Sequence, residues 1–247
     1  VDETGEPIVV ISEDANNDGY INASELAGDI GVTVTLPAQA VSGDTLTVTD
    51  GIAPQVVTLT TTDITNGAVT LDFAAPVEGA TIIVTSTLTD GVGTVSLAGS
   101  DSAVLDTTAP KTTLTIDSIT DDTGVSSTDF ITSDNDGLTV SGTLSTGLVS
   151  GEILEYSNDA GVTWTNITAS VSGTAISHVD GSLTSTETVH IRVTDTAGNS
   201  GTADTQLVTI DTTAPTTTLT IDSITDDTGV STTDFITTDN NGLTIGA

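Results

Sequence analysis

A segment of 35 residues occurs twice in this chain. Residues 106–140 read DTTAPKTTLTIDSITDDTGVSSTDFITSDNDGLTV, and residues 211–245 repeat them with 30 of 35 positions identical, a shift of 105 residues. A period of this length matches a whole globular domain rather than the roughly 20 to 50 residues of a solenoid or propeller repeat. The sequence therefore predicts a tandem array of small domains.

The repeated register also predicts the domain boundaries. DTTAP at 106–110 and 211–215 is typical of a short linker because proline fixes the backbone, and the opening VDETGEP takes the same place. Asp90 and Asp195 lie 105 residues apart, which extends the register into the first unit. We therefore expect three units with these bounds: 1–105, 106–210 and, as the N-terminal fragment of a third repeat, 211–247.

Apolar residues alternate with threonine over much of the chain, as in VTVTL at 32–36, TLTVT at 45–49 and VHIRV at 189–193. This two-residue period predicts strands with Val, Ile and Leu facing inward and Thr facing water. Gly, Asp and Asn between the runs predict turns at roughly 8 to 12 residue intervals. The expected fold class is all-β: tandem immunoglobulin-like β-sandwich domains of about seven strands each, in a linear array. Their cores should be mainly aliphatic, because the chain has one Trp, two Tyr and three Phe.

The charge excludes some partners. The chain has 35 Asp and Glu against two Lys and Arg, a formal net charge of −33. Nucleic acid and anionic membrane surfaces would repel it, because binding either depends on Lys and Arg. Hydrophobic residues make up 36% of the chain, so it can bury a core, but self-repulsion should oppose compaction unless cations bind. Calcium is the expected cation because carboxylate, amide and carbonyl oxygens are its usual ligands.

Several other features are missing from the sequence. The chain has no cysteine and no methionine, so disulfides and thiolate metal sites are excluded. No run approaches the roughly 18 apolar residues of a membrane span, and Val1 does not open a signal peptide. We expect an internal fragment of a longer protein, without direct membrane contact.

One motif in the first unit points to calcium. Residues 14–25, DANNDGYINASE, satisfy the EF-hand loop pattern D-x-[DN]-x-[DN]-G-x5-E. The ligands expected from the loop positions are Asp14, Asn16, Asp18, Tyr20 through its carbonyl, Asn22 directly or through water, and Glu25. Because alternating strand patterns flank the motif, we expect an EF-hand-like loop between strands rather than a helix-loop-helix sensor. A solvated acidic loop is the alternative interpretation.

The second and third units carry acidic clusters in the corresponding loop. They are Asp121, Asp122, Asp129, Asp134 and Asp136 in the second unit, and Asp226, Asp227, Asp234 and Asp239 in the third. A water-facing loop whose Asp side chains start turns explains any one of these residues equally well.

Topology predicts where these loops lie. In an immunoglobulin-like sandwich the loop after the first strand lies beside the linker that follows the unit, and the turn between the last two strands lies beside the preceding linker. At one junction, the EF-hand-like loop should therefore meet Asp106, Asp195 and Asn199. At the next junction, Asp211 should be approached by Asp121, Asp122 and Asp129. Asp90 occupies the same turn in the first unit. Like charges this close would repel unless cations lay among them, so Ca²⁺ should fix the angle between neighbouring repeats.

Several segments resemble a known family. TIDSITDDTGVSSTDFIT at 115–132, YSNDAGVTW at 156–164, VTDTAGNSG at 193–201 and the DTTAP linker are similar to bacterial immunoglobulin-like repeats of giant calcium-dependent (RTX) adhesins. The resemblance implies an extender: a monomeric rod of repeats, rigidified by several Ca²⁺ ions, that holds distal binding domains away from the cell surface for adhesion or biofilm formation. It also implies type I secretion and an extracellular location on a Gram-negative bacterium.

Two other functions are suggested by single features of the sequence. Residues 157–164, SNDAGVTW, resemble the Asp-box of sialidases, but one copy is more typical of a structural hairpin, and neither His178 nor His190 has a catalytic partner at useful spacing. We therefore do not expect an enzyme. The alternative function is calcium-dependent ligand binding by the repeats, to a glycan or to ice through threonine arrays such as TLTTTD. Thr on half-exposed strands explains those arrays more simply.

Overall fold

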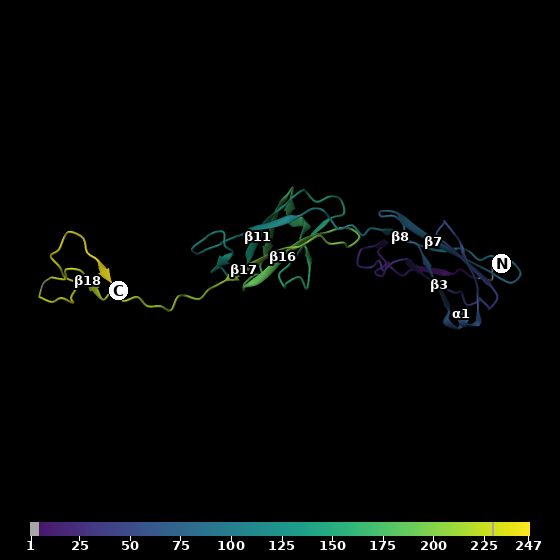
Figure 1. Ribbon diagram of the computed structural model, residues 1–247, viewed down its shortest axis with the longest axis horizontal. Helices are drawn as coiled ribbons and strands as arrows, with labels where there is room; N and C mark the ends of the chain where they lie inside the picture. The colour runs from purple at the N-terminus through teal and green to yellow at the C-terminus, as the bar shows by residue number, and fades with distance from the viewer. Residues whose placement is uncertain (1–4, 229) are drawn as a thin grey trace. The chain divides into compact units, whose positions relative to one another are not determined.

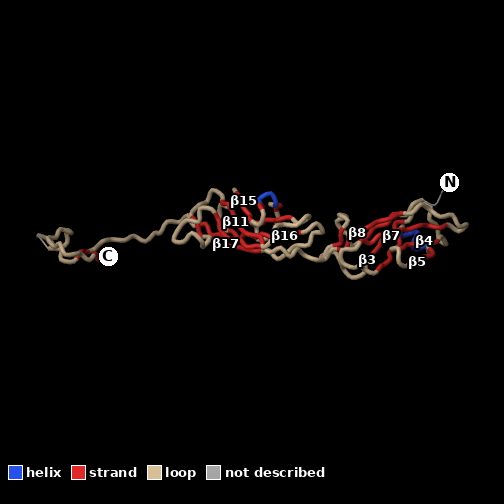
Figure 2. Tube along the Cα trace, turned by 90° about the horizontal axis from the view of Figure 1, so that it is seen from above, coloured by secondary structure: helices blue, strands red, loops and turns tan. Residues whose placement is uncertain are grey.

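The computed structural model describes residues 5–228 and 230–247 (Figure 1). Contacts divide the chain into two units, Val1–Ile210 and Asp211–Ala247, and each is described by itself. The first unit contains two hydrophobic cores, one formed by residues between Val9 and Leu105 and the other by residues between Leu114 and Val208. Strands and the loops that join them make up almost all of both regions (Figure 2).

The first sandwich consists of two sheets. Their strand orders are β1-β3-β6 and β2-β8-β7-β4-β5. The strands are β1 (Ile8–Ile11), β2 (Tyr20–Ile21), β3 (Ile30–Thr35), β4 (Thr45–Thr49), β5 (Gln55–Thr58), β6 (Ala68–Phe73), β7 (Thr81–Thr89) and β8 (Gly99–Leu105). The alternating sequence explains their burial: in β4, Leu46 and Val48 are fully buried while the threonines on either side are half-buried.

The second sandwich repeats this plan. Its sheets have the orders β14-β15-β11-β9 and β10-β17-β16-β12-β13. The elements are β9 (Leu114–Ile119), β10 (Ile131–Thr132), β11 (Leu138–Leu144), β12 (Ile153–Ser157), β13 (Thr165–Asn166), the 3-10 turn Thr168–Ser170, β14 (Val171–Ser172), β15 (Ala175–Asp180), β16 (Glu187–Thr194) and β17 (Asp204–Ile210). The expected all-β sandwich fold is confirmed.

In both sandwiches the chain changes sheet after its first strand. β1 pairs with β3 in one sheet, and the chain then crosses to the other sheet, where β2 runs parallel to the last strand β8. β9 and β10 do the same, and β10 runs parallel to β17. The acidic loop predicted from the sequence is this crossing segment in each case. It therefore lies at the end of the sandwich where the last strand runs into the linker.

One expectation about the first sandwich is wrong. The threonines of TLTTTD do not form a strand array, because Thr61–Asn66 forms a short helix, α1. Thr60 caps this helix: its side chain accepts from the Asp63 amide, and the Asp63 carboxylate accepts from the Thr60 amide at 2.8 Å. This reciprocal capping box favours a helix start over a continued strand, and Gly67 ends the helix in the left-handed conformation.

The second unit is a small segment without a core. It contains the strand pair β18 (Ser223–Ile224) and β19 (Ile245–Gly246). None of its described side chains is buried. Over residues 5–228 and 230–247 the structure contains no helix with the length and hydropathy of a membrane span.

Candidate functional site

The EF-hand-like loop of the first sandwich has an ordered internal structure. Asp14 is buried, and its two carboxylate oxygens accept hydrogen bonds from the backbone amides of Asp18 and Gly19, both at 3.0 Å. Asn16 Nδ2 donates to Asp18 Oδ2 at 2.9 Å, so the side chains at loop positions 3 and 5 face one another. Gly19 has φ +87°, which the sharp turn at position 6 requires. The residues at positions 1, 3 and 5 are thus brought together.

The C-terminal half of the loop folds back on itself. Glu25 Oε2 accepts a hydrogen bond from the Asn22 amide at 3.1 Å, while Asn22 Oδ1 accepts from the amide and hydroxyl of Ser24. Tyr20 begins β2, and its amide donates to Asp18 Oδ1 at 2.9 Å. The hydrogen bond between the Asn22 amide and the Glu25 carboxylate keeps Glu25, the last position of the motif, beside Asn22.

The same loop contacts the second sandwich. Asn22 Nδ2 donates to the Ala197 carbonyl at 3.0 Å, and the Ala23 amide donates to Asn199 Oδ1 at 2.9 Å. Asn199 Nδ2 in turn donates to the backbone carbonyl of Asp106 in the linker at 2.8 Å. The structure therefore brings together the loop, the linker and the turn after β16. Asp14, Asn16 and Asp18 make their hydrogen bonds within the loop instead.

The turn that carries Asn199 has a counterpart in the first sandwich. Asp195 Oδ1 accepts from the Asn199 amide at 2.8 Å, and Asp90 Oδ1 accepts from the Thr94 amide at 2.8 Å. Both aspartates therefore stabilise the same type of turn. The hydrogen bond from the Thr94 amide is the main cause that lowers the pKa of Asp90, and burial has a smaller, opposite effect. The position that corresponds to Asn199 is occupied by Thr94, which has no side-chain amide that could donate to a linker.

Negative charges gather around the first linker. Burial raises the pKa of the Asp106 carboxyl above its ordinary value, although the Thr108 amide opposes this, and the charges of Asp195 and Glu78 raise it further. The neighbouring charges that raise the pKa of Asp106 oppose its ionisation, and a cation there would relieve this effect. A hollow of about 280 Å³ lies beside them, lined by Asn22, Ala23, Ser24, Thr107, Ala109, Gly198, Asn199 and Ser200.

The acidic loop of the second sandwich contains a buried oxygen without a partner. Asp122 Oδ2 accepts from the Phe130 amide at 3.1 Å, but Oδ1 of the same carboxylate is enclosed and accepts from no residue that the structure describes. Asp121 and Phe130 both have positive φ, 54° and 60°, a conformation that is rare for a side chain as large as Phe. A buried carboxylate oxygen with no hydrogen bond is an acceptor that a water or a cation can satisfy.

The remaining aspartates of this loop serve its turns and repel one another. Asp129 Oδ1 accepts from the Ile131 amide at 3.1 Å, and Asp134 Oδ1 accepts from the Asp136 amide at 3.1 Å. The pKa of Asp136 is raised, mainly by its contact with the Asp134 carboxyl and charge, and further by burial and by Asp121.

The second unit repeats this local structure. Asp227 Oδ2 accepts from the Phe235 amide at 3.2 Å, and its Oδ1 is again buried without a partner among the described residues. Asp226 and Phe235 have φ of 51° and 61°, and Asp234 Oδ1 accepts from the Ile236 amide at 3.1 Å. Because this unit has no hydrophobic core, the loop conformation depends on its own sequence rather than on a sandwich around it. Asp211 accepts from the Thr213 amide at 2.8 Å, and its expected approach to Asp121, Asp122 and Asp129 stays a prediction.

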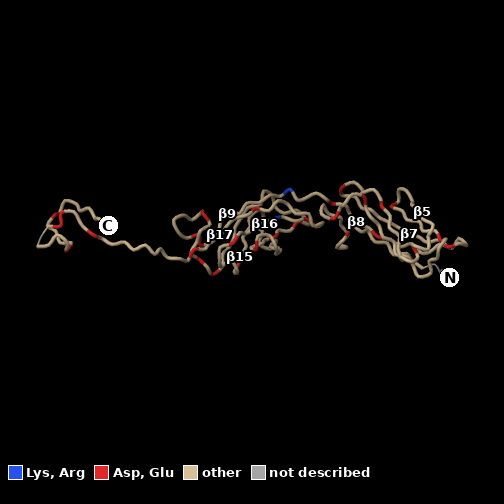
Figure 3. The backbone as a smooth tube through the Cα atoms, turned by 60° about the horizontal axis from the view of Figure 1, so that its bottom comes forward, with Lys and Arg blue, Asp and Glu red and all other residues tan. Residues whose placement is uncertain are grey.

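The donor set of these loops fits a hard cation. Across residues 5–228 and 230–247, no three His, Asp or Glu side chains lie close enough together to form a metal cluster by themselves. Calcium sites also use amide and backbone carbonyl oxygens, which the first loop supplies at Asn16, Tyr20 and Asn22. The unpartnered oxygens of Asp122 and Asp227 are acceptors of the same kind. Many of the acidic residues lie in loops rather than within strands, and Figure 3 shows their positions along the chain.

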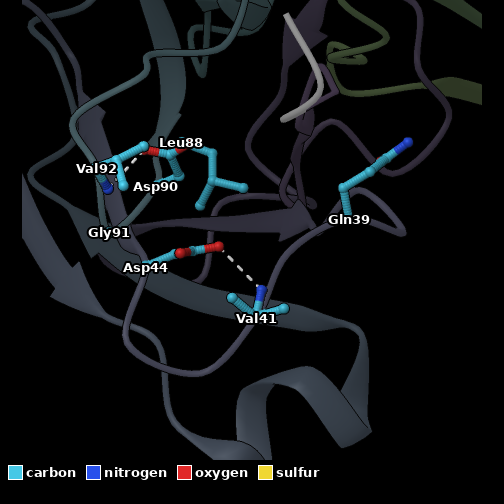
Figure 4. Close-up of a pocket in the computed structure, with 7 residues that line it drawn as sticks. All are labelled: Gln39, Val41, Asp44, Leu88, Asp90, Gly91 and Val92. Atoms are coloured by element: carbon cyan, nitrogen blue, oxygen red, sulfur yellow. Dashed lines mark hydrogen bonds between the residues drawn. The ribbon is translucent and has the colours of Figure 1, made fainter.

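Asp90 also borders the hollow shown in Figure 4, at the end of the first sandwich opposite the linker. Its volume is about 340 Å³, and it is lined by Gln39, Val41, Asp44, Leu88, Asp90, Gly91 and Val92. The two carboxylates there are engaged locally: Asp44 Oδ2 accepts from the Val41 amide at 2.9 Å, and Asp90 Oδ1 accepts from the Val92 amide at 2.9 Å. The Asp90 carboxylate therefore accepts its hydrogen bonds from its own turn.

The Asp-box-like segment is a self-contained hairpin. Asp159 accepts from the amides of Val162 and Thr163 and from the Thr163 hydroxyl, and Trp164 Nε1 donates to the Gly161 carbonyl at 3.0 Å. Trp164 thus anchors the turn of this hairpin. The guanidinium of Arg192 lies 3.8 Å from its ring centroid and pairs with Glu155 at 2.8 Å.

The two histidines pack against aromatic rings in this region. His190 lies edge-on to Trp164, with ring centroids 6.4 Å apart. His178 lies against Tyr156 at 4.6 Å, and burial lowers its pKa. Both imidazoles have packing positions rather than the geometry of a nucleophile and its base.

Two further sets of acidic residues hold the structure together and were not predicted from the sequence. Asp101 Oδ2 accepts from the Ile11 amide and Asp204 Oδ2 accepts from the Ile116 amide, both at 2.8 Å, which ties the first strand of each sandwich to the last strand in the opposite sheet. Glu78 accepts from the linker residues Thr107 and Thr108. Asp101 and Asp204 could have been found as aspartates within strands of alternating pattern. Nothing in the sequence marks Glu78.

Neither a protein-family model nor a curated protein matches the chain. Among solved structures, it is similar to the fibronectin(III)-like modules of CbhA from Clostridium thermocellum, with a TM-score of 0.51 and 12% identity over 82% of this chain and 94% of that one. The fold is that of tandem fibronectin III and immunoglobulin-like domains. At this identity the similarity shows the fold alone.

Two further structures are less similar in overall superposition. One belongs to a study of host cell surface retention of a 1.5-MDa bacterial ice-binding adhesin, with a TM-score of 0.38 and 21% identity over 90% of this chain and 68% of that one. The other is a tetra-tandem repeat in the extending region of a large adhesion protein, with a TM-score of 0.27 and 19% identity over 91% of this chain and 52% of that one.

Proposed function

We propose that this chain is an extender segment of a bacterial cell-surface adhesin, in which Ca²⁺ bound at loops and linkers keeps successive sandwiches at a fixed angle. The observation that carries the proposal is the junction in which Ala23, Asn199 and Asp106 are joined by hydrogen bonds. A loop, a linker and a turn from three parts of the chain meet there, and the loop has the residue types of a calcium site. The role is mechanical rather than catalytic.

The loops would bind the ions through oxygen ligands. In the first sandwich Asp14, Asn16, Asp18, Tyr20, Asn22 and Glu25 would hold Ca²⁺; in the second, Asp121, Asp122 and Asp129 would contribute, and in the third copy Asp226, Asp227 and Asp234. Ca²⁺ would supply positive charge where burial and neighbouring carboxylates raise the pKa of Asp106 and Asp136. Asp90, Asp195, Asn199 and Asp211 would complete or support sites at the turns and linkers.

The wider setting follows from the sequence resemblance. Repeats of this kind in calcium-dependent (RTX) adhesins imply type I secretion from a Gram-negative bacterium and a place on the cell surface, where Ca²⁺ is abundant. The net charge of −33 would oppose compaction until Ca²⁺ binds, which suits export of an unfolded chain. Adhesion or biofilm formation would depend on distal domains that this segment projects.

Calorimetric titration of the metal-free chain with Ca²⁺ tests the binding. We expect saturable binding, and we expect Asp14→Asn and Asp122→Asn each to weaken one class of site by about tenfold, because calcium affinity follows the charge of the ligands. Asp72→Asn is the matched control, since Asp72 is an exposed strand residue outside every acidic loop. Absence of Ca²⁺ uptake by the chain, or equal effects of all three substitutions, would contradict the proposal.

A further inference from the structure

Glu78 lies in a tight turn that is fixed to the end of the first sandwich. The Ala80 amide donates to the Val77 carbonyl at 2.9 Å, and Gly79 has φ +77°, which this turn requires at its third position. The turn is bound to Leu105, the last residue of β8: the Gly79 amide donates to the Leu105 carbonyl at 2.8 Å, and the Leu105 amide donates to the Ala80 carbonyl at 3.0 Å. Glu78 is therefore held where the chain leaves the sandwich.

The Glu78 carboxylate accepts three hydrogen bonds from the linker. Oε1 accepts from the Thr107 amide at 2.9 Å and from the Thr108 hydroxyl at 2.7 Å, and Oε2 accepts from the Thr107 hydroxyl at 2.9 Å. Hydrogen bonds to an ionised acceptor are stronger than those between neutral groups. The bonds from Thr108 and Thr107 lower the pKa of Glu78, so the side chain is a carboxylate at neutral pH.

The linker is held from the other side as well. Asn199 of the second sandwich donates to the Asp106 carbonyl at 2.8 Å. The first three linker residues are therefore bound by one side chain from each sandwich. These contacts use protein groups alone.

The second sandwich has no equivalent of Glu78. The residue 105 positions later is Leu183, which is fully buried in the core. The last residue of β17, Ile210, is held instead by the Thr186 hydroxyl, which accepts from the Ile210 amide at 2.9 Å. The two DTTAP segments are identical, but the turn before the second-to-last strand, β7 or β16, carries a carboxylate at this position only in the first sandwich.

We propose that Glu78 is a positioning residue that restrains the 106–110 linker through protein groups, in addition to the restraint that Ca²⁺ provides. The inference rests on the proposed extender function, and it adds that the two DTTAP linkers are restrained in different ways. The first would remain partly restrained when Ca²⁺ is removed, because Glu78 still binds both threonines. The second, preceded by Leu183, would depend on Ca²⁺.

Spin labels in the full chain test this role. The chain has no native cysteine, so Val56→Cys and Val179→Cys would label two exposed positions, one on each sandwich. The width of the distance distribution between the labels, measured with EDTA at neutral pH, reports how freely the linker moves. We expect Glu78→Gln to broaden it about twofold, because a short linker released from its contacts behaves as a flexible chain.

Two further variants keep the test specific. Glu6→Gln removes the same charge from an exposed residue and should leave the width unchanged. Thr107→Val with Thr108→Val removes the two hydroxyl donors and should broaden the distribution, and adding Glu78→Gln to this pair should broaden it little more, because the three residues act through one set of bonds. Equal widths for Glu78→Gln and Glu6→Gln, with both chains folded by circular dichroism, would overturn the inference, and so would fully additive broadening.

The same labels separate this inference from the calcium proposal. If Ca²⁺ and EDTA give identical results in every titration and scattering experiment, while Glu78→Gln still broadens the distribution, calcium rigidification fails and the role of Glu78 stands. If EDTA loosens the chain and Glu78→Gln changes nothing, the role of Glu78 fails and calcium rigidification stands.

Discussion

Asn199 of the second sandwich donates a hydrogen bond to the backbone carbonyl of Asp106 in the linker, at 2.8 Å. The same side chain accepts from the Ala23 amide of the first sandwich through Oδ1, at 2.9 Å. One amide group thus satisfies a backbone donor and a backbone acceptor on either side of a joint. The linker belongs to the 35-residue segment that occurs twice, and the loop occupies the corresponding place in the first unit.

Asn199→Ala should loosen this joint while leaving both sandwiches folded. The Ala23 amide would lose its acceptor, and a hydrogen bond of this kind contributes about 0.5–1.5 kcal/mol. We expect the Ala23 amide to exchange with solvent up to about tenfold faster, measured by NMR hydrogen exchange. Thr94→Ala, at the matching turn position of the first sandwich, should leave the Ala23 rate unchanged. An unaltered rate in the Asn199 variant would show that the contact is not formed in solution.

Asp101→Ala should destabilise the first sandwich. Asp101 accepts the Ile11 amide at 2.8 Å, and Ile11 is 1% exposed, so the variant would leave a buried backbone donor unpaired. Such a donor costs about 1–3 kcal/mol of unfolding free energy. Urea unfolding followed by circular dichroism measures the loss, with Asp72→Ala as the control on an exposed strand position. Asp204→Ala should have a similar effect in the second sandwich, through Ile116. Two variants as stable as the Asp72 control would contradict this role.

The Asp159 hairpin should lose stability only in strong acid. Hydrogen bonds from the Thr163 side chain and backbone and from Ser157 lower the pKa of Asp159 from an ordinary 3.8 to about 2. Since the folded state binds this proton less tightly than the unfolded state, the stabilisation is fully present above about pH 4 and is lost as the pH falls through about 2. Carbon-13 NMR titration of the Asp159 carboxyl measures this pKa directly. A midpoint near 4 would mean that the hairpin bonds are absent in solution.

Much of the fold could be predicted from the residues. The alternation in TLTVT placed Leu46 and Val48 in the core and the threonines outside, because a strand has a two-residue period. The repeat register predicted that Asp90 and Asp195 would start equivalent turns. The topology of a sandwich predicted that the EF-hand-like loop would meet the linker at Asp106 and the turn with Asn199, and residues at the Asn22 end of the loop do so. Each of these inferences depends on a local pattern or on a fixed chain path.

The rest depends on contacts between distant residues. The helix at Thr61–Asn66 was missed because threonine favours strands, although Thr60 and Asp63 carry the spacing of a capping box. Glu78 and Thr107 are 29 residues apart, and no sequence pattern links them. The unpartnered oxygens of Asp122 and Asp227 are also invisible in the sequence, because burial of a single oxygen depends on how the loop closes around it.

Small-angle X-ray scattering of the whole chain with Ca²⁺ and with EDTA tests the central claim most directly, because it measures the arrangement of the sandwiches as well as their folding. If Ca²⁺ rigidifies the junctions, its removal should shorten the maximum dimension and give the scattering profile of a more flexible chain, and added Ca²⁺ should restore both. Scattering curves that coincide in Ca²⁺ and EDTA, from a chain that is folded in both, would contradict the account.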